Sequence, residues 1–593
     1  MRRDVEAIEK LATLGTDETT RRPSREPRIH GWPGWLVGLM VFAGSFLFRF
    51  LDPYFYNDHF LWISGGRQVL VYGELPFRDF FDPGYFLQHL ASAGSQRVFG
   101  YNLLGEALLS ISLLSAGTAI TFMLSSRISR SYAIGLLAAA LVVGMYPRLY
   151  NYHKVFFLAF GLLVLWRYVD RPTTWNLVLV GLTTAVAFLF RHDNGLYMAL
   201  PVVVVIVAAH WNDWGRLLRR AALYAASAIL PLLPFFVFLE LNGGVVAYFS
   251  SGAEWALQRR GTVAPWPTFT ADASAPLSIF QPANAFVWLY ALFITLPFLT
   301  LLVLACQHVR WRRVAATPPE AIKILPAAIL CAVSAPLLLR TPLEARLADV
   351  VAPTAVIGAW LLGQWFGPIR WQETLARSRQ PRSGPSPTLL RQVTVASLPT
   401  AFRSITAVAI VGITSISVAT AGELQERLEE SAIFDGPTAV LDRGEEVFDQ
   451  LRESPPDREL YPGDNELRLA RYVRECTQPD DRLLVTSFAP QLYFYSGRAA
   501  AGGAIQVDAT AEQQAEYLAS VPGEPVPVVI AVEEEDGDYF ESTFETIEDY
   551  LRENYRVALQ LDPGDDDPSY RVLVHKQRVP SGVYRRWSLP CYR

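Results

Sequence analysis

Long apolar runs separated by short polar segments dominate the first 420 residues of the chain. Most of these runs approach the roughly 20 residues that an α-helix needs to cross a bilayer. They predict about eleven membrane-spanning helices, near residues 34–51, 103–124, 133–147, 155–169, 176–190, 195–210, 221–241, 285–305, 323–339, 349–366 and 402–421. The run at 133–147 is the weakest, because it is short and stops at Pro147. Residues 1–33 are polar and basic and show no signal-peptide pattern, so they are predicted to form a cytoplasmic tail.

A different pattern begins at Glu423, where the apolar runs stop and charged residues become frequent. Helical spacing of apolar residues predicts helices at 464–477 and 539–554. Short β-branched runs predict strands, at 482–488, 526–532, 555–561 and 570–576. Residues 422–593 are therefore predicted to form a small α/β domain. It lacks a glycine-rich phosphate loop and a His/Cys metal motif, which favours a scaffold or acceptor-docking role over a catalytic one.

The composition supports a membrane protein. Hydrophobic residues make up 51% of the 593 residues, charged residues make up 18%, and the mean hydropathy is +0.20. A soluble chain of this length would carry more charge, so most of the chain is expected to face lipid. The formal net charge of −5 and the absence of a Lys/Arg block argue against a nucleic-acid partner.

The distribution of Lys and Arg predicts the orientation. With the N-terminus inside, the inner segments before residue 421 carry 24 Lys or Arg and the outer segments carry 10. This bias favours an inside N-terminus, and an odd number of spans then places residues 422–593 outside. The predicted protein is a polytopic α-helical membrane protein (34–421) of a bacterial-type inner membrane. Its outer loops are 52–102 and 242–284, and it ends in an extracytoplasmic α/β domain (422–593).

The first outer loop carries five acids: Asp52, Asp58, Glu74, Asp79 and Asp82. Apolar stretches beside these acids suggest an interfacial structure around a polar cavity. Asp52 and Glu74 are interpreted as solvated loop residues. Asp58, which closely follows the first predicted span, is interpreted as functional.

An ordered set of short motifs in this loop supports a family resemblance. Asp58 is followed by residues 73–79 (Gly-Glu-Leu-Pro-Phe-Arg-Asp), by 82–85 (Asp-Pro-Gly-Tyr) and by an apolar helix ending in Phe-Gly. This order resembles the first loop of the C-type glycosyltransferases that use polyprenyl-phosphate sugars, nearest in pattern to the protein O-mannosyltransferase and aminoarabinose transferase group (family 39). The resemblance extends to the tail through residues 479–482 and 490–498.

The resemblance implies a catalytic carboxylate at Asp58, with Asp82 and Asp193 as supporting carboxylates or possible ligands of a divalent cation. Two positions depart from the family pattern. Relatives often have Asp-Glu where this chain has Asn57 and Asp58, and the aminoarabinose enzymes have a phosphate-binding Lys where this chain has Asp82. The donor phosphate contact must therefore come from elsewhere in the chain, and the metal requirement stays open.

The expected chemistry can be matched to residues independently. Transfer of a sugar to a hydroxyl needs a carboxylate base, and a phosphate leaving group needs cations rather than a strong acid. Basic candidates for donor phosphate binding stand at outer ends of predicted spans: His153, Lys154, Arg191, Arg340 and Arg346. The alternative for these residues is snorkelling to the interface or structural ion pairing. The predicted activity is transfer of a sugar from a polyprenyl-phosphate donor in the membrane lipid to a hydroxyl of an extracytoplasmic lipid, glycan or protein.

Two other functions remain to be weighed. A non-catalytic polyprenyl-lipid-binding or transport protein is the alternative, although no internal repeat is visible and the charges collect in outer loops. An oligosaccharyltransferase would need a Trp-Trp-Asp signature in its outer domain, where Trp587 is the only Trp after residue 371. In loop 242–284 the tryptophans are interpreted as interface anchors, with a lid over the donor as the alternative.

The four cysteines divide between two environments. Cys306 and Cys331 lie at a span end and within a span, whereas Cys476 and Cys591 fall in the predicted outer domain. An oxidising compartment permits a disulfide between the latter two, which would tie down the C-terminus. Two unpaired thiols are the alternative, and a Cα separation of about 4.4–6.8 Å would favour the bond.

Overall fold

A computed structural model describes most of the chain. The described residues are 34–258, 284–311, 319–340, 344–366, 407, 411–412, 414–416, 418, 423–454, 465–486, 488–503, 505, 511–523, 526–533, 545–561 and 569–593. Most of the predicted span 402–421, the side chain of Arg340 and most of loop 259–284 lie outside these residues.

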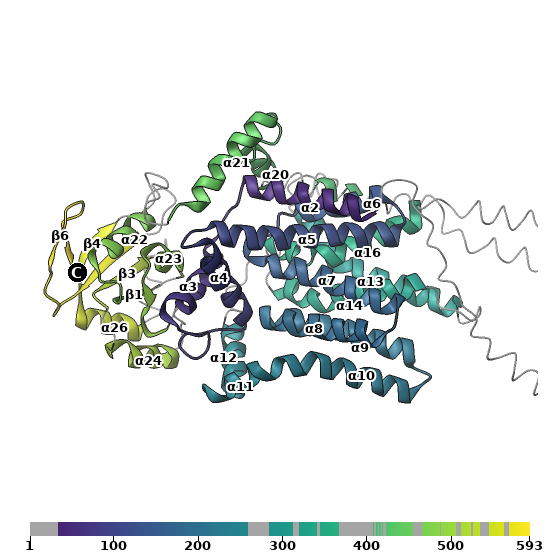
Figure 1. The fold of residues 1–593 in the computed structure, drawn as a ribbon, viewed down its shortest axis with the longest axis horizontal. Coiled ribbons are helices and arrows are strands. Elements are labelled where there is room, and N and C mark those ends of the chain that lie inside the picture. Colours follow the sequence, from purple (N-terminus) through teal and green to yellow (C-terminus); the bar gives the residue numbers. More distant parts are fainter. Residues whose placement is uncertain are drawn as a thin grey trace, which may run out of the picture.

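The membrane part is a bundle of roughly parallel and antiparallel helices (Figure 1). Its main helices are α2 (Gly34–Leu51), α5 (Leu104–Ser129), α6 (Tyr132–Gly144), α7 (Tyr152–Asp170), α8 (Thr174–Phe190), α9 (His192–His210), α10 (Trp214–Ile229), α11 (Leu233–Leu241), α13 (Ala285–Trp311), α14 (Pro319–Arg340) and α16 (Val351–Phe366). A single 3-10 turn, η3 (Leu230–Leu232), joins α10 to α11. Among the described residues, six helical segments are long and apolar enough to cross a membrane, and four further apolar helices are shorter. The chain is thus a mostly helical membrane protein.

Helix α5 stands at the centre of the bundle, in contact with α2, α6, α7 and α16. Small residues allow the close approach: a Cβ at Gly117 would meet Val155 of α7, and one at Gly135 of α6 would meet Ser126 of α5. The hydroxyls of Thr118 and Thr121 bond to carbonyls four residues back, so these polar side chains cost little in an apolar bundle.

Several predicted spans begin earlier in the structure than the apolar pattern indicated. Helix α7 starts at Tyr152 and α9 at His192, so His153, Lys154 and Asp193 occupy first helical turns rather than loops. These polar residues find partners inside the protein, which lets the helix extend beyond its apolar run. The weak run at 133–147 is a helix of 13 residues that ends at Gly144.

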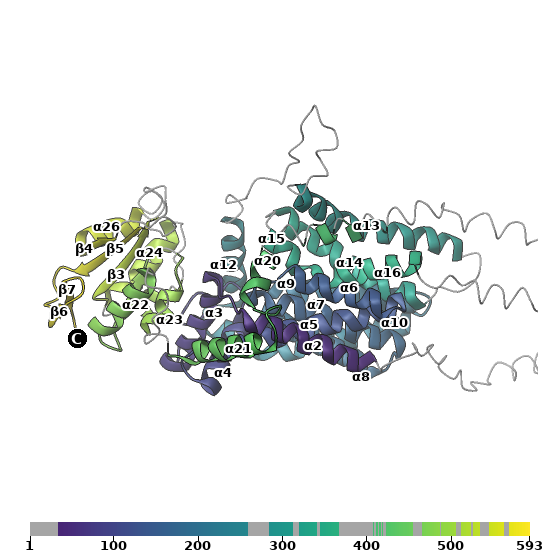
Figure 2. The same cartoon turned by 90° about the horizontal axis from the view of Figure 1, so that it is seen from above.

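The loop 52–102 folds into two short helices between the bundle and the C-terminal domain (Figures 1 and 2). They are α3 (Asn57–Arg67), continued by a π-helical turn η1 (Gln68–Tyr72), and α4 (Phe86–Phe99), which packs against α3. In the second long loop the structure describes α12 (Val245–Gln258).

In the described part of the C-terminal domain, five strands form a mixed sheet with the order β2-β1-β3-β5-β4. Its strands are β1 (Arg482–Val485), β2 (Ala499–Ala500), β3 (Val528–Glu533), β4 (Tyr555–Leu561) and β5 (Ser569–His575), and a separate hairpin joins β6 (Gly582–Tyr584) to β7 (Leu589–Cys591). Strand β1 pairs in parallel with β2 and β3, whereas β5 pairs antiparallel with β3 and β4. The helices of this region are α20 (Glu423–Glu430), α21 (Pro437–Arg452), α22 (Asn465–Cys476), α23 (Gln491–Ser496), α24 (Ala511–Ser520) and α26 (Glu545–Asn554).

The predicted bond between Cys476 and Cys591 is present. It joins the end of α22 to β7, with the two Cα atoms 4.3 Å apart. Tyr592 N–H also donates to the carbonyl of Cys476, so the last residues are tied to α22. The C-terminus is thereby fixed against the domain core.

Candidate functional site

Asp58 stands in the first turn of α3, seven residues beyond the end of α2. Its side chain is half-buried and has no hydrogen-bond or ion-pair partner among the described residues. A carboxylate in the first turn is favoured by the helix dipole. Asp58 is therefore an accessible acid held at the edge of the bundle, with its acceptor capacity uncommitted within the described part of the chain.

Tyr85 marks the centre of a group of ionisable residues. Its hydroxyl is under the electrostatic influence of Arg191, Asp193, Arg346 and Asp58, which come from three separate stretches of sequence. Burial raises the pKa of this phenol, and the charge of Arg191 lowers it in part. The Arg191 guanidinium carbon lies 5.4 Å from the centre of the Tyr85 ring. The structure thus brings these predicted site residues together around one buried ring.

The basic side of the site contains a buried ion pair. Lys154 Nζ lies 2.5 Å from Asp349 Oδ2, and both side chains are nearly inaccessible to solvent. Arg346 Nη1 lies 3.5 Å from the same oxygen and is 30% exposed, while Asp349 Oδ1 is buried without a hydrogen-bond partner in the described structure. Two cations face one carboxylate here, so this side carries a net positive charge.

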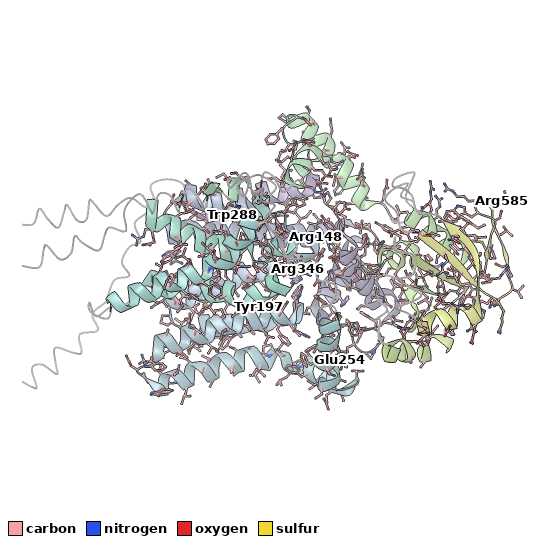
Figure 3. All side chains as sticks on the ribbon, turned by 180° about the vertical axis from the view of Figure 1, so that it is seen from behind. Arg148, Tyr197, Glu254, Trp288, Arg346 and Arg585 are labelled. Atoms are coloured by element: carbon pink, nitrogen blue, oxygen red, sulfur yellow. A yellow bond between two sulfur atoms is a disulfide. The ribbon has the colours of Figure 1, made fainter. Side chains whose placement is uncertain are left out.

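Figure 3 shows Arg148 and Arg346 at the end of the bundle that faces the C-terminal domain. Arg148 lies over the Tyr56 ring, 4.2 Å from its centre, and donates to the Tyr150 hydroxyl over 3.3 Å. The same hydroxyl is under the influence of Asp58 and Asp349. The acidic and basic sides of the site therefore meet at Tyr150.

Arg191 and Asp193 form a second ion pair at the start of α9, with Nε and Oδ2 2.8 Å apart. The other oxygen, Asp193 Oδ1, is buried and has no partner in the described structure. One residue further, Asn194 Nδ2 lies 2.9 Å from Nδ1 of His153, which is buried. His153 therefore supports the start of α9 from α7.

Asp82 differs from Asp58, because it is buried and fully engaged. Its Oδ1 accepts from the backbone N–H groups of Gly84 and Tyr85, over 3.0 and 2.7 Å, and its Oδ2 accepts from Tyr248 Oη over 3.1 Å. Burial raises the pKa of this carboxyl to about 6, although the three hydrogen bonds act in the opposite direction. Asp82 thereby joins its loop to α12.

Tyr248 and His192 extend this connection to α9. The Tyr248 hydroxyl lies 3.3 Å from His192 Nε2, and the imidazole stacks on Phe188. Gly84 has φ 115°, and a Cβ at this position would come within 2.6 Å of His192 Nδ1. Glycine is therefore required where the acidic loop passes over α9.

The C-terminal domain holds the acidic loop from the other side. Phe80 is buried among core residues of that domain, and Arg482 Nη2 lies 2.5 Å from Glu74 Oε1. Phe81 N–H donates to the carbonyl of Gly503. Glu74 is thus an ion-pair residue between domains, and its interpretation as a solvated acid was wrong.

Asp52 was also interpreted as a solvated acid, and the structure shows otherwise. It is buried, and its Oδ2 lies 3.1 Å from Arg427 Nη1 of α20. Its backbone carbonyl accepts from the Tyr146 hydroxyl. Arg427 closely follows the last predicted span, and it lies next to Asp52 in the fold. The sequence of loop 52–102 alone does not reveal this partner.

Sequence reasoning also missed residues that connect the site. The contact of Tyr248 with Asp82 and the pairing of Asp349 with Lys154 emerge only from the fold. The one signal in the sequence was the opposite charge of Lys154 and Asp349, which could have suggested an ion pair. Arg49, inside the first span, is fully buried and donates to the carbonyls of Pro147 and Val142. His59 pairs with the buried Glu106 over 3.0 Å.

Among the described residues, no three His, Cys, Asp or Glu side chains are grouped to hold a metal ion.

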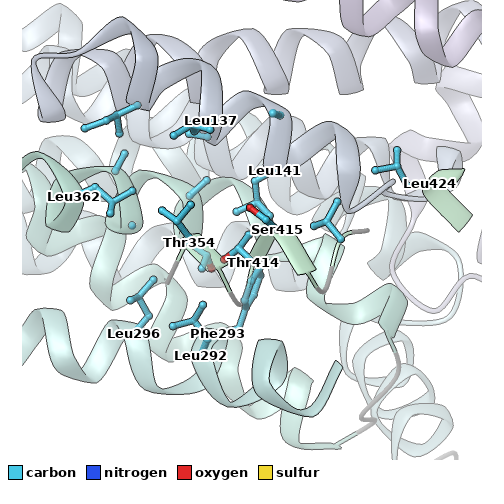
Figure 4. Close-up of a pocket in the computed structure, with 18 residues that line it drawn as sticks. Leu137, Leu141, Leu292, Phe293, Leu296, Thr354, Leu362, Thr414, Ser415 and Leu424 are labelled. Carbon is cyan, nitrogen blue, oxygen red and sulfur yellow. The ribbon is translucent and has the colours of Figure 1, made fainter. Parts of the chain in front are cut away.

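An apolar cavity of about 300 Å³ lies within the bundle between α6, α13 and α16 (Figure 4). Its walls include Leu141, Phe293, Thr354 and Leu362. Thr354 is five residues beyond Asp349 on the chain, so the cavity begins close to the basic side of the site and continues along α16. None of its lining residues is ionisable.

The fold and site therefore define a helical membrane protein with a mixed-sheet domain at one end and an ionisable cluster where the two meet. No protein-family model matches the chain, and no curated protein sequence matches it. The chain is similar in structure to ArnT from Cupriavidus metallidurans bound to undecaprenyl phosphate, at 15% identity and a TM-score of 0.46, covering 91% of this chain and 97% of that one. The apo state of the same protein gives 14% identity and a TM-score of 0.44, covering 91% and 98%.

Proposed function

We propose that this protein is a glycosyltransferase that moves a sugar from a polyprenyl-phosphate donor to a hydroxyl of an extracytoplasmic acceptor. The observation that carries the proposal is Asp58, a half-buried carboxylate without a partner among the described residues. It interacts electrostatically with the Tyr85 hydroxyl, as do Arg191 and Arg346. The motif order of loop 52–102, which resembles that of polyprenyl-phosphate-sugar-dependent C-type glycosyltransferases, gives independent support.

The chemistry assigns different tasks to the two sides of the site. Asp58 acts as the base that removes the proton of the acceptor hydroxyl as it attacks the anomeric carbon. The bond from that carbon to the phosphate oxygen breaks, and the phosphate leaves with the polyprenyl chain. Cations that neutralise the phosphate suffice to stabilise this leaving group, so a second catalytic acid is not needed.

Donor phosphate binding is assigned to the basic residues at the outer helix ends: His153, Lys154, Arg191, Arg340 and Arg346. Three of these residues, Lys154, Arg191 and Arg346, each lie close to a carboxylate in the structure. Among these three, the Arg346 side chain is the most exposed to solvent. A phosphate at this position would compete with Asp349 for Lys154 and Arg346, and with Asp193 for Arg191. In this scheme Asp82 and Asp193 are supporting carboxylates that position the loop and the basic residues.

The membrane arrangement proposed for this function has eleven spans. Six full-length and four shorter apolar helices lie among the described residues, and the apolar run 402–421 supplies the eleventh. The Lys/Arg bias supports an inside N-terminus, and with eleven spans the proposed location of the site and the C-terminal domain is the extracytoplasmic face of the cell membrane. The apolar cavity along α16 would receive part of the isoprenoid chain while the phosphate lies at Arg346.

The decisive experiment replaces Asp58 by Asn. Purified protein in lipid nanodiscs is supplied with undecaprenyl-phosphate hexoses and pentoses carrying a ¹⁴C-labelled sugar, together with envelope fractions as acceptor. Asp58→Asn is expected to lower the transfer rate by a factor on the order of 10²–10⁴, because the amide keeps the shape but cannot take the proton. Binding of undecaprenyl phosphate, followed by native mass spectrometry, should be unchanged.

Asp442→Asn is the matched control, since this acid is exposed on α21 and outside the site. It should transfer sugar at the wild-type rate. Near-normal transfer by Asp58→Asn would assign the base to another residue, with Asp193 next to test. Binding of the lipid without transfer of any sugar by the wild-type protein would favour the non-catalytic lipid-binding or transport alternative.

A further inference from the structure

Helices α20 and α21 form a hairpin (residues 423–452) that is attached to the end of α2 nearest the C-terminal domain. Arg427 of α20 pairs with Asp52, and its guanidinium lies 4.8 Å from the centre of the Tyr54 ring. Arg443 Nε of α21 donates to the carbonyl of Leu51, the last residue of α2. Because Leu51 ends a membrane-spanning helix, these contacts hold the hairpin at the level of the membrane surface.

The hairpin projects sideways from the bundle. In Figure 1 α21 rises from the C-terminal domain past the end of α2, and in Figure 2 it lies alongside α2. Its C-terminal part is covered, since Val447 and Leu451 are buried and Leu103 N–H donates to the carbonyl of Leu451. The first turns of α21 and the connection to α20 extend beyond the bundle.

Helix α21 has two chemically different faces. Its acids, Asp442, Glu445, Glu446 and Asp449, fall on one side of the helix at 100° per residue. Val447 and Leu451 lie on the other side, which continues through Gly444 to Leu441 and Phe448. Leu441 and Phe448 are seven residues apart and therefore share a face. The apolar face is thus wider than the part that the bundle covers.

The uncovered residues are large and strongly exposed. Phe434, in the connection between the two helices, is 81% exposed, and Leu441 is 71% exposed. On the adjoining helix α2, Leu39, Met40 and Leu47 are also exposed and form part of its lipid-facing surface. Large apolar side chains that gather at the surface level of a membrane mark a contact with lipid.

We propose that the α20–α21 hairpin is an interfacial membrane anchor, in which Phe434 and Leu441 insert into the lipid leaflet on the side of the C-terminal domain. Lipid is the favoured occupant because the hairpin is attached to Leu51 and Asp52 at the end of α2, a membrane-spanning helix that itself carries exposed apolar side chains. The acidic face turns toward water, so insertion depends on apolar contact rather than on attraction to anionic headgroups. The hairpin would thereby fix the height of the C-terminal domain above the bilayer. This inference does not depend on the proposed enzymatic function.

The test uses the full chain in phosphatidylcholine nanodiscs. Phe434→Cys and Leu441→Cys are labelled one at a time with an environment-sensitive NBD fluorophore, in a background with Cys306 and Cys331 replaced by Ala and with the disulfide kept oxidised. Val579→Cys is the matched control, because Val579 is 87% exposed but lies next to the β6–β7 hairpin at the far end of the C-terminal domain. Labels at 434 and 441 should be quenched by bromine-substituted lipid chains and protected from iodide, whereas the label at 579 should show the reverse.

Three outcomes would overturn the proposal. Iodide quenching at 434 and 441 equal to that at 579 would place these residues in water. Protection that rises with protein concentration in detergent, without quenching by the brominated chains, would indicate a protein interface instead. Stronger insertion on addition of anionic lipid would contradict the apolar mechanism. Hydroxyl-radical footprinting of the unmodified protein in nanodiscs, with Phe434 expected to be protected and Trp587 reactive, checks the result without substitutions.

Discussion

Asp58 and Asp82 belong to the same loop, yet their surroundings give the two carboxylates different properties. Asp58 is half-buried and makes no hydrogen bond or ion pair to the described residues, so it can receive a proton from a bound molecule. Asp82 is buried and accepts three hydrogen bonds, two from its own loop and one from Tyr248. His89 lies 3.9 Å away, but burial lowers the pKa of its imidazole to about 3, so it adds no positive charge there. Asp82 is suited to hold the loop rather than to exchange protons with a substrate.

The raised pKa of Asp82 leads to a pH-dependent stability. Burial raises it from 3.8 to about 6, so the folded state binds the proton more tightly than the unfolded state. This contribution to the free energy of unfolding is fully present below about pH 4 and is lost as the pH rises through 6. Its full size is on the order of 3 kcal/mol at 1.36 kcal/mol per pKa unit.

Asp82→Asn removes this titration while keeping an oxygen for the backbone donors. Relative to wild type, the variant should therefore gain apparent unfolding free energy as the pH is raised from 4 to 6, measured by thermal unfolding in nanodiscs. Asp442→Asn, an exposed acid, is expected to run parallel to wild type. If the unfolding free energies of Asp82→Asn and wild type changed in parallel with pH, burial would not raise the pKa of the Asp82 carboxyl.

At the scale of elements, the acidic loop is held between three parts of the protein that are distant in sequence. Phe80 enters the core of the C-terminal domain, Glu74 pairs with Arg482, and Asp82 bonds to Tyr248 of α12. The segment between η1 and α4 contains little regular secondary structure, apart from a single bridge between Pro76 and Phe80. Its shape therefore depends on the parts that contact it.

Phe80→Ala tests this dependence. Removing a buried aromatic ring should lower the free energy of unfolding by about 3–5 kcal/mol. It should also accelerate amide hydrogen exchange in residues 73–85 and in α23, because the loop loses its anchor. Phe99→Ala is the control, since Phe99 is 42% exposed at the end of α4. Unchanged exchange in residues 73–85 would mean that the C-terminal domain does not position the loop.

The apolar pattern was sufficient for most of the elements. It predicted α2 to the residue, and it located α22, β4 and β5 to within a residue or two of their ends. It failed at the starts of α7 and α9, where Lys154 and Asp193 continue a helix because Asp349 and Arg191 neutralise them. The periodicity of apolar residues cannot reveal that Lys154 has Asp349 as its partner, 195 residues further along the chain. For the same reason it missed the pairing of Asp52 with Arg427. The helices α20 and α21 were also not predicted, although the apolar residues of α21 recur at helical spacing.

At the scale of the whole molecule, the ionisable cluster lies where the bundle, the two loop helices and the C-terminal domain meet (Figures 1 and 3). The C-terminal domain makes three contacts with the rest of the chain here. Its core encloses Phe80, its Arg482 forms an ion pair with Glu74, and its Phe494 carbonyl accepts a hydrogen bond from the Tyr101 hydroxyl. The order of this domain is therefore linked to the geometry of the acidic loop. The disulfide belongs to the same core as Phe80, since Cys476 is one of its buried members.

Loss of the disulfide is expected to weaken the C-terminal domain and, through it, the loop. The bond closes a loop with a sequence separation of 115 residues, for which the chain-entropy model gives about 4–5 kcal/mol. Cys476→Ser/Cys591→Ser should therefore show faster hydrogen exchange in β6, β7 and α22, and a smaller increase in residues 73–85, while the bundle helices keep wild-type exchange. Cys331→Ala is the control, because this free cysteine is buried in the bundle. If the double variant exchanges like wild type in β7, the hydrogen bonds from Tyr592 and Ser581 are enough to hold the C-terminus, and the bond contributes little to order. Faster exchange in β7 with none in residues 73–85 would instead show that the core around Phe80 is maintained without the crosslink.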